Sequence, residues 1–344
     1  MRGHGVKVLV VGAGIAGLAA ARTLRAWGAD VEVVERAAAA RTEGAGIYLP
    51  GNAVRALTSL GVTGFRAAEI KRQTISDHRG RPLMDLPVDS LWHGVGPCLA
   101  THRASLHQAL LADVLVRWSC TVSSVDSSGS VVLADGSVLE YDLVIGADGV
   151  HSSVRQILIG VSARPLGFQC RRFVVPWPDT SPVWSLMLGR NAAFLTIPIG
   201  DGQVYCYTEG DVEAFADPVP KLLANAPEAH RAPLEEVALP RWSRGVVTLI
   251  GDAAHATSPN MAQGAAMAVE DALVLAAALS RSDTIEGALR AFEERRRPRT
   301  EWVRAQTHRR DRSRSLPGPV RNLVLRRFGE RMFRANYGPL RERP

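Results

Sequence analysis

Apolar residues along the chain form patterns that predict two kinds of sheet. Short continuous apolar runs, each followed by glycine or an acid, are typical of buried strands in a parallel sheet. Such runs lie at Val8–Val11, at Val31–Val34, just before Asp148 and at Val246–Ile250. Between residues 161 and 244, β-type runs such as "VWSLML" and "QVYCYTE" are separated by Gly, Pro and Asp, which predicts an inserted antiparallel sheet. Ala- and Leu-rich segments after the first run and after Pro259 predict helices, so the expected class is α/β.

A glycine-rich turn, "GAGIAG" at residues 12–17, joins the first run to the first predicted helix. Gly12 allows a tight turn, Gly14 lets a pyrophosphate approach the backbone, and Gly17 lets the helix sit close to the strand. Glu35 ends the second run, where it can accept hydrogen bonds from a ribose. A buried helix that merely contains glycines would leave this acid unexplained. The pattern predicts a dinucleotide site and leaves NAD, NADP and FAD open.

Two more acids follow predicted strands. Asp148 lies in "GADG" and Asp252 in "IGDAAHATSP". Parallel strands of one sheet bring their carboxyl ends to the same edge, so both acids are expected beside the first glycine loop. An NAD site needs only the first loop, whereas three such segments along the chain imply a longer ligand.

Composition limits the classes of protein to consider. The chain has 344 residues, 46% of them hydrophobic, and a prior of about 150 residues per domain predicts two domains. Its four cysteines are scattered, with no CxxC pair and no zinc-like histidine spacing, so no metal site is expected. No stretch approaches the ~18 uninterrupted apolar residues of a membrane span. These features favour a cytoplasmic protein.

The net charge of +7 belongs to the C-terminal tail. Residues 290–344 contain 17 Arg against six acidic residues, a net of +11, which leaves a net of −4 for the preceding residues. The tail reads as two helices with apolar stripes, broken at "LPGP", residues 316–319. Arginine-rich helix faces are usually solvated, and attraction to an acidic surface or to nucleic acid is the alternative. No nucleic-acid motif accompanies the charge, so no nucleic-acid partner is expected.

The three motifs together resemble those of single-component FAD-dependent aromatic hydroxylases, the para-hydroxybenzoate hydroxylase superfamily. The similar branches are the salicylate-hydroxylase-like and urate-hydroxylase-like ones, and the resemblance covers most of residues 6–310. It implies a discontinuous Rossmann-type FAD-binding domain, residues 1–160 and 245–300, and a substrate-binding β-sheet module, residues 161–244. Part of residues 65–100 could join this module. Residues 301–344 would form basic C-terminal helices.

The resemblance also implies which residues bind FAD. Glu35 would bind the adenosine ribose, Arg36 would lie along the adenine edge, and Arg103 would reach the pyrophosphate. The backbone near Val122 would meet adenine. Gly44, Ala45 and Gly46 would be small to let the chain pass the flavin ring. The complete implied set is Gly12, Gly14, Ala16, Gly17, Glu35, Arg36, Gly46, Arg103, Val122, Asp148, Asp252, Gln263, Gly264 and Ala265.

The helix after Pro259 is expected to face the reactive edge of the flavin. Unpaired N–H groups at a helix N-terminus carry about half a positive charge, which suits the negative charge of a reduced flavin. Gln263, Gly264 and Ala265 would occupy that place, and Pro259 would wall the edge. Relatives usually carry Gly where this chain has Ala262. Further along, Glu270 and Asp271 are expected to be solvated or to cap structure rather than to act in catalysis.

The implied reaction comes from the cofactor. NAD(P)H would reduce FAD as a transient co-substrate, and reduced flavin and O2 would form a C4a-hydroperoxide that hydroxylates or epoxidises an electron-rich aromatic molecule. Tyr205 and Tyr207 share one face of a predicted strand and either contact substrate or pack in the sheet. Arg155 either docks NAD(P)H or is a structural partner. No histidine is assigned as a general base.

Two other functions stay open on sequence grounds. One is a different flavin oxidoreductase on the same scaffold, such as a reductase or an epoxidase; a halogenase is disfavoured because no WxWxIP stretch occurs. The other is a non-catalytic FAD-binding protein. Either a monomer or a homodimer is compatible with the sequence.

Overall fold

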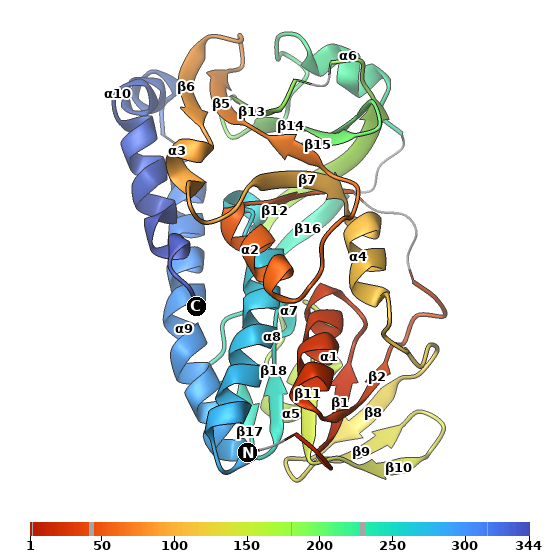
Figure 1. Cartoon of the computed structure of the whole chain (residues 1–344). Helices are drawn as coiled ribbons and strands as arrows, with labels where there is room; N and C mark the ends of the chain where they lie inside the picture. The colour runs from red at the N-terminus through yellow and green to blue at the C-terminus, as the bar shows by residue number, and fades with distance from the viewer. Residues whose placement is uncertain (2, 41–44, 180, 228–230, 315) are drawn as a thin grey trace.

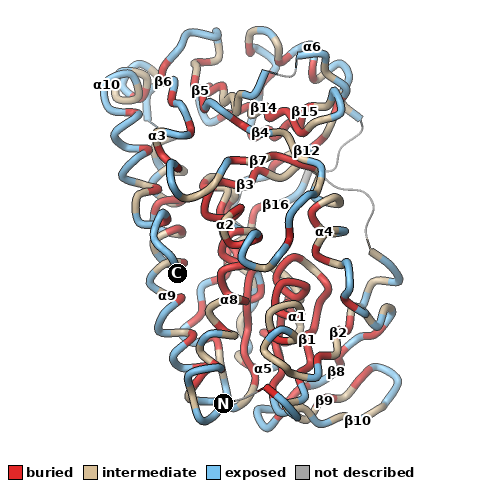
Figure 2. Tube along the Cα trace, viewed as in Figure 1, coloured by how far each residue is buried: buried red, intermediate tan, exposed pale blue. Residues whose placement is uncertain are grey.

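The computed structural model describes residues 1, 3–40, 45–179, 181–227, 231–314 and 316–344. A five-stranded sheet forms the lower half of the molecule in Figure 1, with strand order β17-β18-β11-β1-β2. Its pairs are parallel except for the short edge strand β17. The sheet is the predicted one, because the continuous apolar runs supply strands buried on both faces, as the red segments in Figure 2 show. The strands are β1 (Lys7–Val11), β2 (Asp30–Val34), β11 (Leu143–Gly146), β17 (Ser243–Arg244) and β18 (Val247–Leu249).

Helices rich in small residues cover this sheet. The first, α1 (Ile15–Trp27), packs against α8 (Gly264–Arg281), and alanines at the contact allow the two backbones to approach closely. Gly28 ends α1 with a φ of +103°, a left-handed conformation that favours glycine. A small antiparallel sheet lies near β2, at the lower right of Figure 1. It is formed by β8 (Val122–Val125), β9 (Ser130–Leu133) and β10 (Val138–Glu140).

A seven-stranded sheet forms the upper half, with order β16-β12-β15-β14-β13-β5-β6. All its pairs are antiparallel except β13 with β5. Two strands from the 65–100 region, β5 and β6, join the strands of the 161–244 module here. The strands are β5 (Arg72–Asp77), β6 (Pro82–Pro87), β12 (Arg164–Pro176), β13 (Val183–Leu188), β14 (Ala193–Gly200), β15 (Gln203–Glu209) and β16 (Arg231–Glu236).

Short elements connect the two halves. A three-stranded antiparallel sheet, order β3-β7-β4, lies between them. The remaining elements are β3 (Gly46–Leu49), β4 (Ala68–Ile70), β7 (Cys98–His102), α2 (Gly51–Ser59), α3 (Asp89–Trp92), α4 (Arg103–Leu111), α5 (Ser153–Ile159), α6 (Val219–Ala224), α7 (Asp252–His255), η1 (Pro259–Met261) and η2 (Gly338–Arg341).

The basic tail forms two helices, α9 (Ile285–Arg314) and α10 (Gly318–Tyr337), separated near Pro317 as the sequence predicts. The expected domain boundary at residue 300 falls inside α9, which continues without interruption along the left side of Figure 1. α10 lies beside β6 on the outside of the upper half. No helix in the described part of the chain is long and apolar enough to cross a membrane.

A buried ionic cluster ties α9 to α8. Arg296 of α9 is fully buried and donates to Asp271 Oδ1 at 2.7 Å and to Glu270 Oε2 at 2.8 Å. Arg299 donates to both oxygens of Glu270, at 2.8 and 2.9 Å. Burial alone would raise the pKa of Asp271, but the charges of His255 and Arg296 hold that pKa below its ordinary value. Of the two roles expected for Glu270 and Asp271, the structural one agrees with these contacts and solvation does not. Solvation is likewise wrong for Arg296, because its guanidinium is paired with both acids inside the protein.

We predict that Arg296→Met will lower the free energy of unfolding by about 3–5 kcal/mol, because it leaves two buried carboxylates without their main counter-charge. Urea unfolding followed by circular dichroism measures the change. Arg290→Met, at an exposed position of the same helix, is the matched control and should stay within about 0.5 kcal/mol of the parent. Equal stabilities of the two variants would contradict the proposed importance of this cluster.

Candidate functional site

A cavity of about 680 Å³ lies where the two halves of the molecule meet. Its floor comes from the glycine loop and the segment before α8, and its roof from the seven-stranded sheet. One further wall comes from α9 and α10. Among the residues that line it are Gly14, Ala16, Gly46, Arg103, Gly149, Arg172, Leu186, Leu188, Leu195, Tyr205, Tyr207, Asp252, Pro259, Gln263, Gly264, Ala265, Arg310, Leu325, Met332, Phe333 and Tyr337.

The glycine loop has the geometry that a bound pyrophosphate needs. Gly12 has a φ of +107°, and a Cβ there would lie 2.6 Å from the Ala147 carbonyl oxygen. A Cβ on Gly17 would lie 1.9 Å from the Gly12 carbonyl oxygen, so only glycine permits this packing. Gly14 has open space instead, and no side chain caps the first N–H groups of α1. The loop therefore offers a helix N-terminus to an anion.

Glu35 lies at the end of β2, next to the same loop. Its carboxylate accepts hydrogen bonds from the backbone N–H groups of Ala13 and Ala37, both at 2.9 Å. This places an acid within reach of a ligand that crosses the glycine loop. Arg36 is exposed beside it, whereas Val122 is buried in β8 and is not part of the cavity lining.

Two other predicted residues lie on the cavity wall. Arg103 begins α4, and its backbone N–H donates to the Ala45 carbonyl at 3.1 Å. A Cβ on Gly46 would lie 2.4 Å from Tyr205 Cβ, so the missing side chain allows β3 to pack against this tyrosine. Gly44, also expected here, lies outside the described residues.

The two motif aspartates have different environments. Asp148 accepts hydrogen bonds from the Ser153 and Val154 backbone N–H groups, at 2.7 and 3.1 Å, and from both serine hydroxyls at the start of α5. It caps a helix. Asp252 begins α7, lines the cavity and is exposed to it; no hydrogen bond to its carboxylate occurs among the described residues. Of the two, only Asp252 has a carboxylate available to a ligand.

Arg155 is not at a docking surface. It is 2% exposed, and its guanidinium donates to three backbone carbonyl oxygens, at 2.8 Å for Val161, 3.1 Å for Ala253 and 2.6 Å for Val150. The NAD(P)H-docking expectation is therefore wrong for this residue, because no edge of the guanidinium remains for a phosphate. The structural alternative holds, since Arg155 ties α5 to α7.

The segment before α8 is held from two sides. Ala262 has a φ of +50°, the left-handed conformation that favours the glycine of relatives. The Gln263 side chain pairs with the buried Asn52 of α2, with N···O distances of 2.8 and 3.2 Å. From the C-terminal helices, Arg310 donates to the Asn260 carbonyl at 2.7 Å, and Tyr337 to the Met261 carbonyl at 3.3 Å. These contacts fix the turn that precedes α8, and the N-terminus of α8 lines the cavity.

Tyr205 and Tyr207 both line the cavity, on the predicted common face of β15. The Tyr207 hydroxyl donates to Glu209, and the Arg172 guanidinium lies 5.7 Å from the Tyr207 ring centroid. Burial raises the pKa of Tyr205 to about 12, which keeps its hydroxyl protonated. Burial, reinforced by the negative charge of Asp311, also raises the pKa of Glu209, to about 7.

Much of the remaining wall is apolar and was not identified from the sequence. Leu186, Leu188 and Leu195 of the upper sheet line the cavity, as do Leu325 and Phe333 of α10. The upper-sheet leucines lie in strands that the sequence predicted, but only the fold shows which face they share. The cavity-lining residues of α10 could not be identified in this way, because an apolar stripe on a helix predicts burial but does not indicate which element or cavity it faces.

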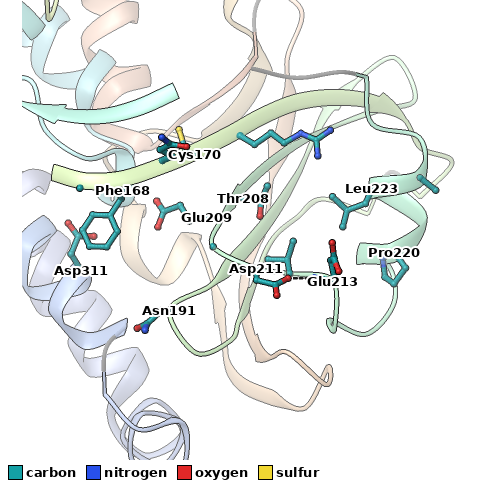
Figure 3. A pocket seen from close by; sticks show the side chains of 16 residues that line it. Phe168, Cys170, Asn191, Thr208, Glu209, Asp211, Glu213, Pro220, Leu223 and Asp311 are labelled. Atoms are coloured by element: carbon teal, nitrogen blue, oxygen red, sulfur yellow. Dashed lines mark hydrogen bonds between the residues drawn. The ribbon is translucent and has the colours of Figure 1, made fainter. Parts of the chain in front are cut away.

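A second cavity, of about 1030 Å³, is lined by Glu209 and by other residues of β12, β15 and α6. Figure 3 shows Glu209 directed toward Phe168 and Asp311, while Asp211 and Glu213 line the same space. Burial raises the pKa of Asp311 to about 6. This cavity holds none of the residues expected to bind the nucleotide, so the first cavity is the candidate active site.

Comparisons with known proteins agree with this geometry. A family model described as an FAD binding domain matches residues 5–165 and 217–307. The chain is 35% identical to an aurachin C monooxygenase/isomerase of Stigmatella aurantiaca over 84% of each protein. It is also 35% identical to a 2-heptyl-3-hydroxy-4(1H)-quinolone synthase of Pseudomonas aeruginosa over 87% of each. Among solved structures, Klebsiella pneumoniae HpxO with FAD and uric acid superposes with a TM-score of 0.88 at 27% identity, covering 99% of this chain and 97% of that one.

The glycine loop at residues 12–17, the available carboxylate of Asp252 and the helix N-terminus at Gly264 fit an extended FAD along the cavity floor. The apolar space above them fits an aromatic molecule. With a family model that covers most of the chain and relatives that match nearly its full length, the conclusion is that the chain belongs to the FAD-dependent aromatic hydroxylases of the para-hydroxybenzoate hydroxylase superfamily.

Proposed function

We propose that this enzyme hydroxylates an apolar, electron-rich aromatic compound, with NAD(P)H as electron donor and O2 as oxygen source. The observation that supports this substrate class is the cavity wall formed by upper-sheet leucines and by Leu325, Met332 and Phe333 of α10. The relatives named for an alkylated quinolone and for aurachin C point in the same direction. Relatives named for 3-amino-4-hydroxybenzoate are about as similar overall, so the wall is the feature that favours the apolar class.

The position of each residue around the cavity floor supports a proposed contact with FAD. The pyrophosphate would lie over Gly14 and the N-terminus of α1, within reach of Arg103, and Glu35 would bind the adenosine ribose. Asp252 would bind the ribityl chain or the pyrophosphate end. The backbone N–H groups of Gly264 and Ala265 would face the flavin edge that becomes negative on reduction.

The protein contributes position and a dry environment to the reaction. FAD, when bound, supplies the transfer of hydride equivalents from NAD(P)H and the activation of O2. Pro259 and Met261 line the cavity and would bound its flavin edge, and the apolar residues of α10 would exclude water from the substrate space. Tyr205, protonated at neutral pH, can donate a hydrogen bond to an oxygen or nitrogen of the substrate.

The proposed function predicts a substrate-dependent reaction. Purified yellow protein should oxidise NAD(P)H slowly alone and at least tenfold faster when a suitable aromatic compound is added, with one O2 consumed per product formed. A panel of 4-quinolones with and without an alkyl chain, together with aminohydroxybenzoates, separates the two substrate classes. Stimulation by the benzoates alone would exclude the apolar class while leaving the monooxygenase assignment intact.

The two motif aspartates should respond differently to alanine. Asp252→Ala is expected to weaken FAD binding by about 1.5–3 kcal/mol, which is roughly 10- to 150-fold, because a hydrogen-bonded charge is lost. Asp148→Ala should keep FAD and lose about 1 kcal/mol of unfolding free energy, as expected for a missing helix cap. Flavin absorbance after gel filtration and urea unfolding measure both effects. Full FAD retention in Asp252→Ala would remove this residue from the site.

Replacing Ala262 by glycine should stabilise the protein. A left-handed alanine costs about 1–2 kcal/mol, and the extra freedom of glycine in the unfolded chain cancels part of the gain. We expect a net increase in unfolding free energy of about 0.5–1 kcal/mol by urea denaturation. Ala277→Gly, at an exposed position within α8, is the control and should cost about 1 kcal/mol. Similar losses in both variants would show that the turn is not strained.

A further inference from the structure

The outer face of α10 is unusually apolar for a solvent-exposed helix. Val320 is 50% exposed, Leu323 68% and Phe328 49%. Val320 and Leu323, three residues apart, are neighbours on the helix surface, and Phe328 follows just over two turns after Val320. The three side chains therefore lie on one half of the helix circumference. Scattered exposed apolar residues need no explanation, but a contiguous group on one face marks an interaction surface.

Two arginines extend this group. Arg327 lies four residues after Leu323 and Arg331 four residues later, so both lie on the same side, and both are exposed. No ion pair within the described ranges engages either of them. Arg334 differs, because it is paired with Glu330 at 2.8 Å. The basic, apolar face made by Val320, Leu323, Arg327, Phe328 and Arg331 is called the α10 outer face below.

The inner side of the same helix lines the active cavity. Leu325 and Phe333 face that space, and Phe333 stacks beneath the Arg310 guanidinium, 4.6 Å from its ring centroid. Met332 lines the cavity and is also 41% exposed, so it lies at the boundary between the two sides. One helix thus separates the α10 outer face from the site of the reaction. Figure 2 shows α10 at the left edge of the molecule, with exposed segments turned outward.

We propose that the α10 outer face docks the enzyme on an anionic lipid surface. A lipid surface satisfies both halves of the patch, because apolar side chains enter the boundary between headgroups and acyl chains while arginines pair with lipid phosphates. Nucleic acid would engage the arginines but would gain little from Val320 and Leu323. A second copy of the chain, docked face to face, would bring the Arg327 and Arg331 charges together.

This docking would set the active cavity beside the membrane interface, separated from it by one helix. The inference concerns attachment and does not depend on the substrate class proposed above. It also requires no membrane-spanning helix, since an amphipathic helix can lie in the plane of the interface.

Flotation of the FAD-loaded enzyme with lipid vesicles tests the proposal, with flavin absorbance in the vesicle fraction as the readout. Vesicles of phosphatidylcholine mixed with phosphatidylglycerol should carry the enzyme at low salt, and pure phosphatidylcholine should carry at least tenfold less. Each arginine near an anionic surface contributes roughly fivefold to binding. The double variant Arg327→Gln, Arg331→Gln should therefore bind the mixed vesicles about 10- to 30-fold more weakly.

A second variant separates the apolar contribution from charge. Leu323→Gln with Phe328→Gln keeps the net charge and the helix propensity, and it should reduce vesicle binding at least tenfold. Two controls should bind like the parent. They are Leu115→Gln, at an 84% exposed leucine outside α10, and the charge-matched pair Arg281→Gln, Arg290→Gln, at exposed positions away from α10. FAD content and NAD(P)H oxidation without vesicles should be unchanged in every variant.

Three results would overturn the proposal. One is equal binding to neutral and anionic vesicles, and another is equal loss of binding in the control pair and in the α10 pair. The third is a dimer in analytical ultracentrifugation that Leu323→Gln, Phe328→Gln converts to monomer while vesicle binding is absent. In that case a second copy covers the face. Failure of vesicle binding leaves the substrate-stimulated NAD(P)H assay unaffected, so the two proposals are tested separately.

Discussion

The buried carboxylate pair on α8 is the constraint on which the active site depends. Asp271 accepts hydrogen bonds from the Gly251 backbone at 2.9 Å and from His255 at 2.7 Å, besides its ion pair with Arg296. One carboxylate therefore holds the turn that presents Asp252 and the helix that follows it. Glu270 extends the same cluster to Asn52, whose side chain holds Gln263 at the start of α8. Neutralising Arg296 of α9 would therefore loosen two parts of the cofactor site together, the turn that presents Asp252 and the start of α8.

The arginine-rich tail therefore has a structural role inside the protein, which its net charge does not reveal. Some of its arginines neutralise buried acids, as Arg296 and Arg299 do, whereas Arg321 donates to the carbonyl oxygens of Gly189 and Leu188. Arg310 spans the site, because it holds the Asn260 carbonyl and stacks on Phe333 and Tyr337. The exposed arginines of α10 are a separate group. A count of charges cannot distinguish these environments, since each depends on which acid or carbonyl the fold brings near.

The sequence predicted the parts of the site that local geometry determines. The Gly12 and Gly17 positions follow from a strand, a tight turn and a helix in close contact. A Cβ on Gly17 would meet the Gly12 carbonyl within the motif, and a Cβ on Gly12 would meet Ala147, which directly follows the adjacent strand β11. The common face of Tyr205 and Tyr207 follows from strand alternation. By contrast, Asn52, Arg296 and Leu325 meet the site through contacts between elements far apart in the chain. Their residue types fit ordinary helix surfaces, so only the tertiary structure shows their role.

The error at Arg155 has a general physical cause. An arginine after a "DG" turn at a sheet edge is well placed for a phosphate, and an exposed guanidinium there would bind one. The same fork of donors also matches backbone carbonyls that a short helix and a loop leave without partners. In this fold the carbonyls of Val150, Val161 and Ala253 converge on one point, and satisfying them buries the side chain. Where unpaired carbonyls converge, they compete with a ligand phosphate for the same guanidinium N–H groups. A sequence motif shows that an arginine is present but does not show which carbonyls the fold brings to it.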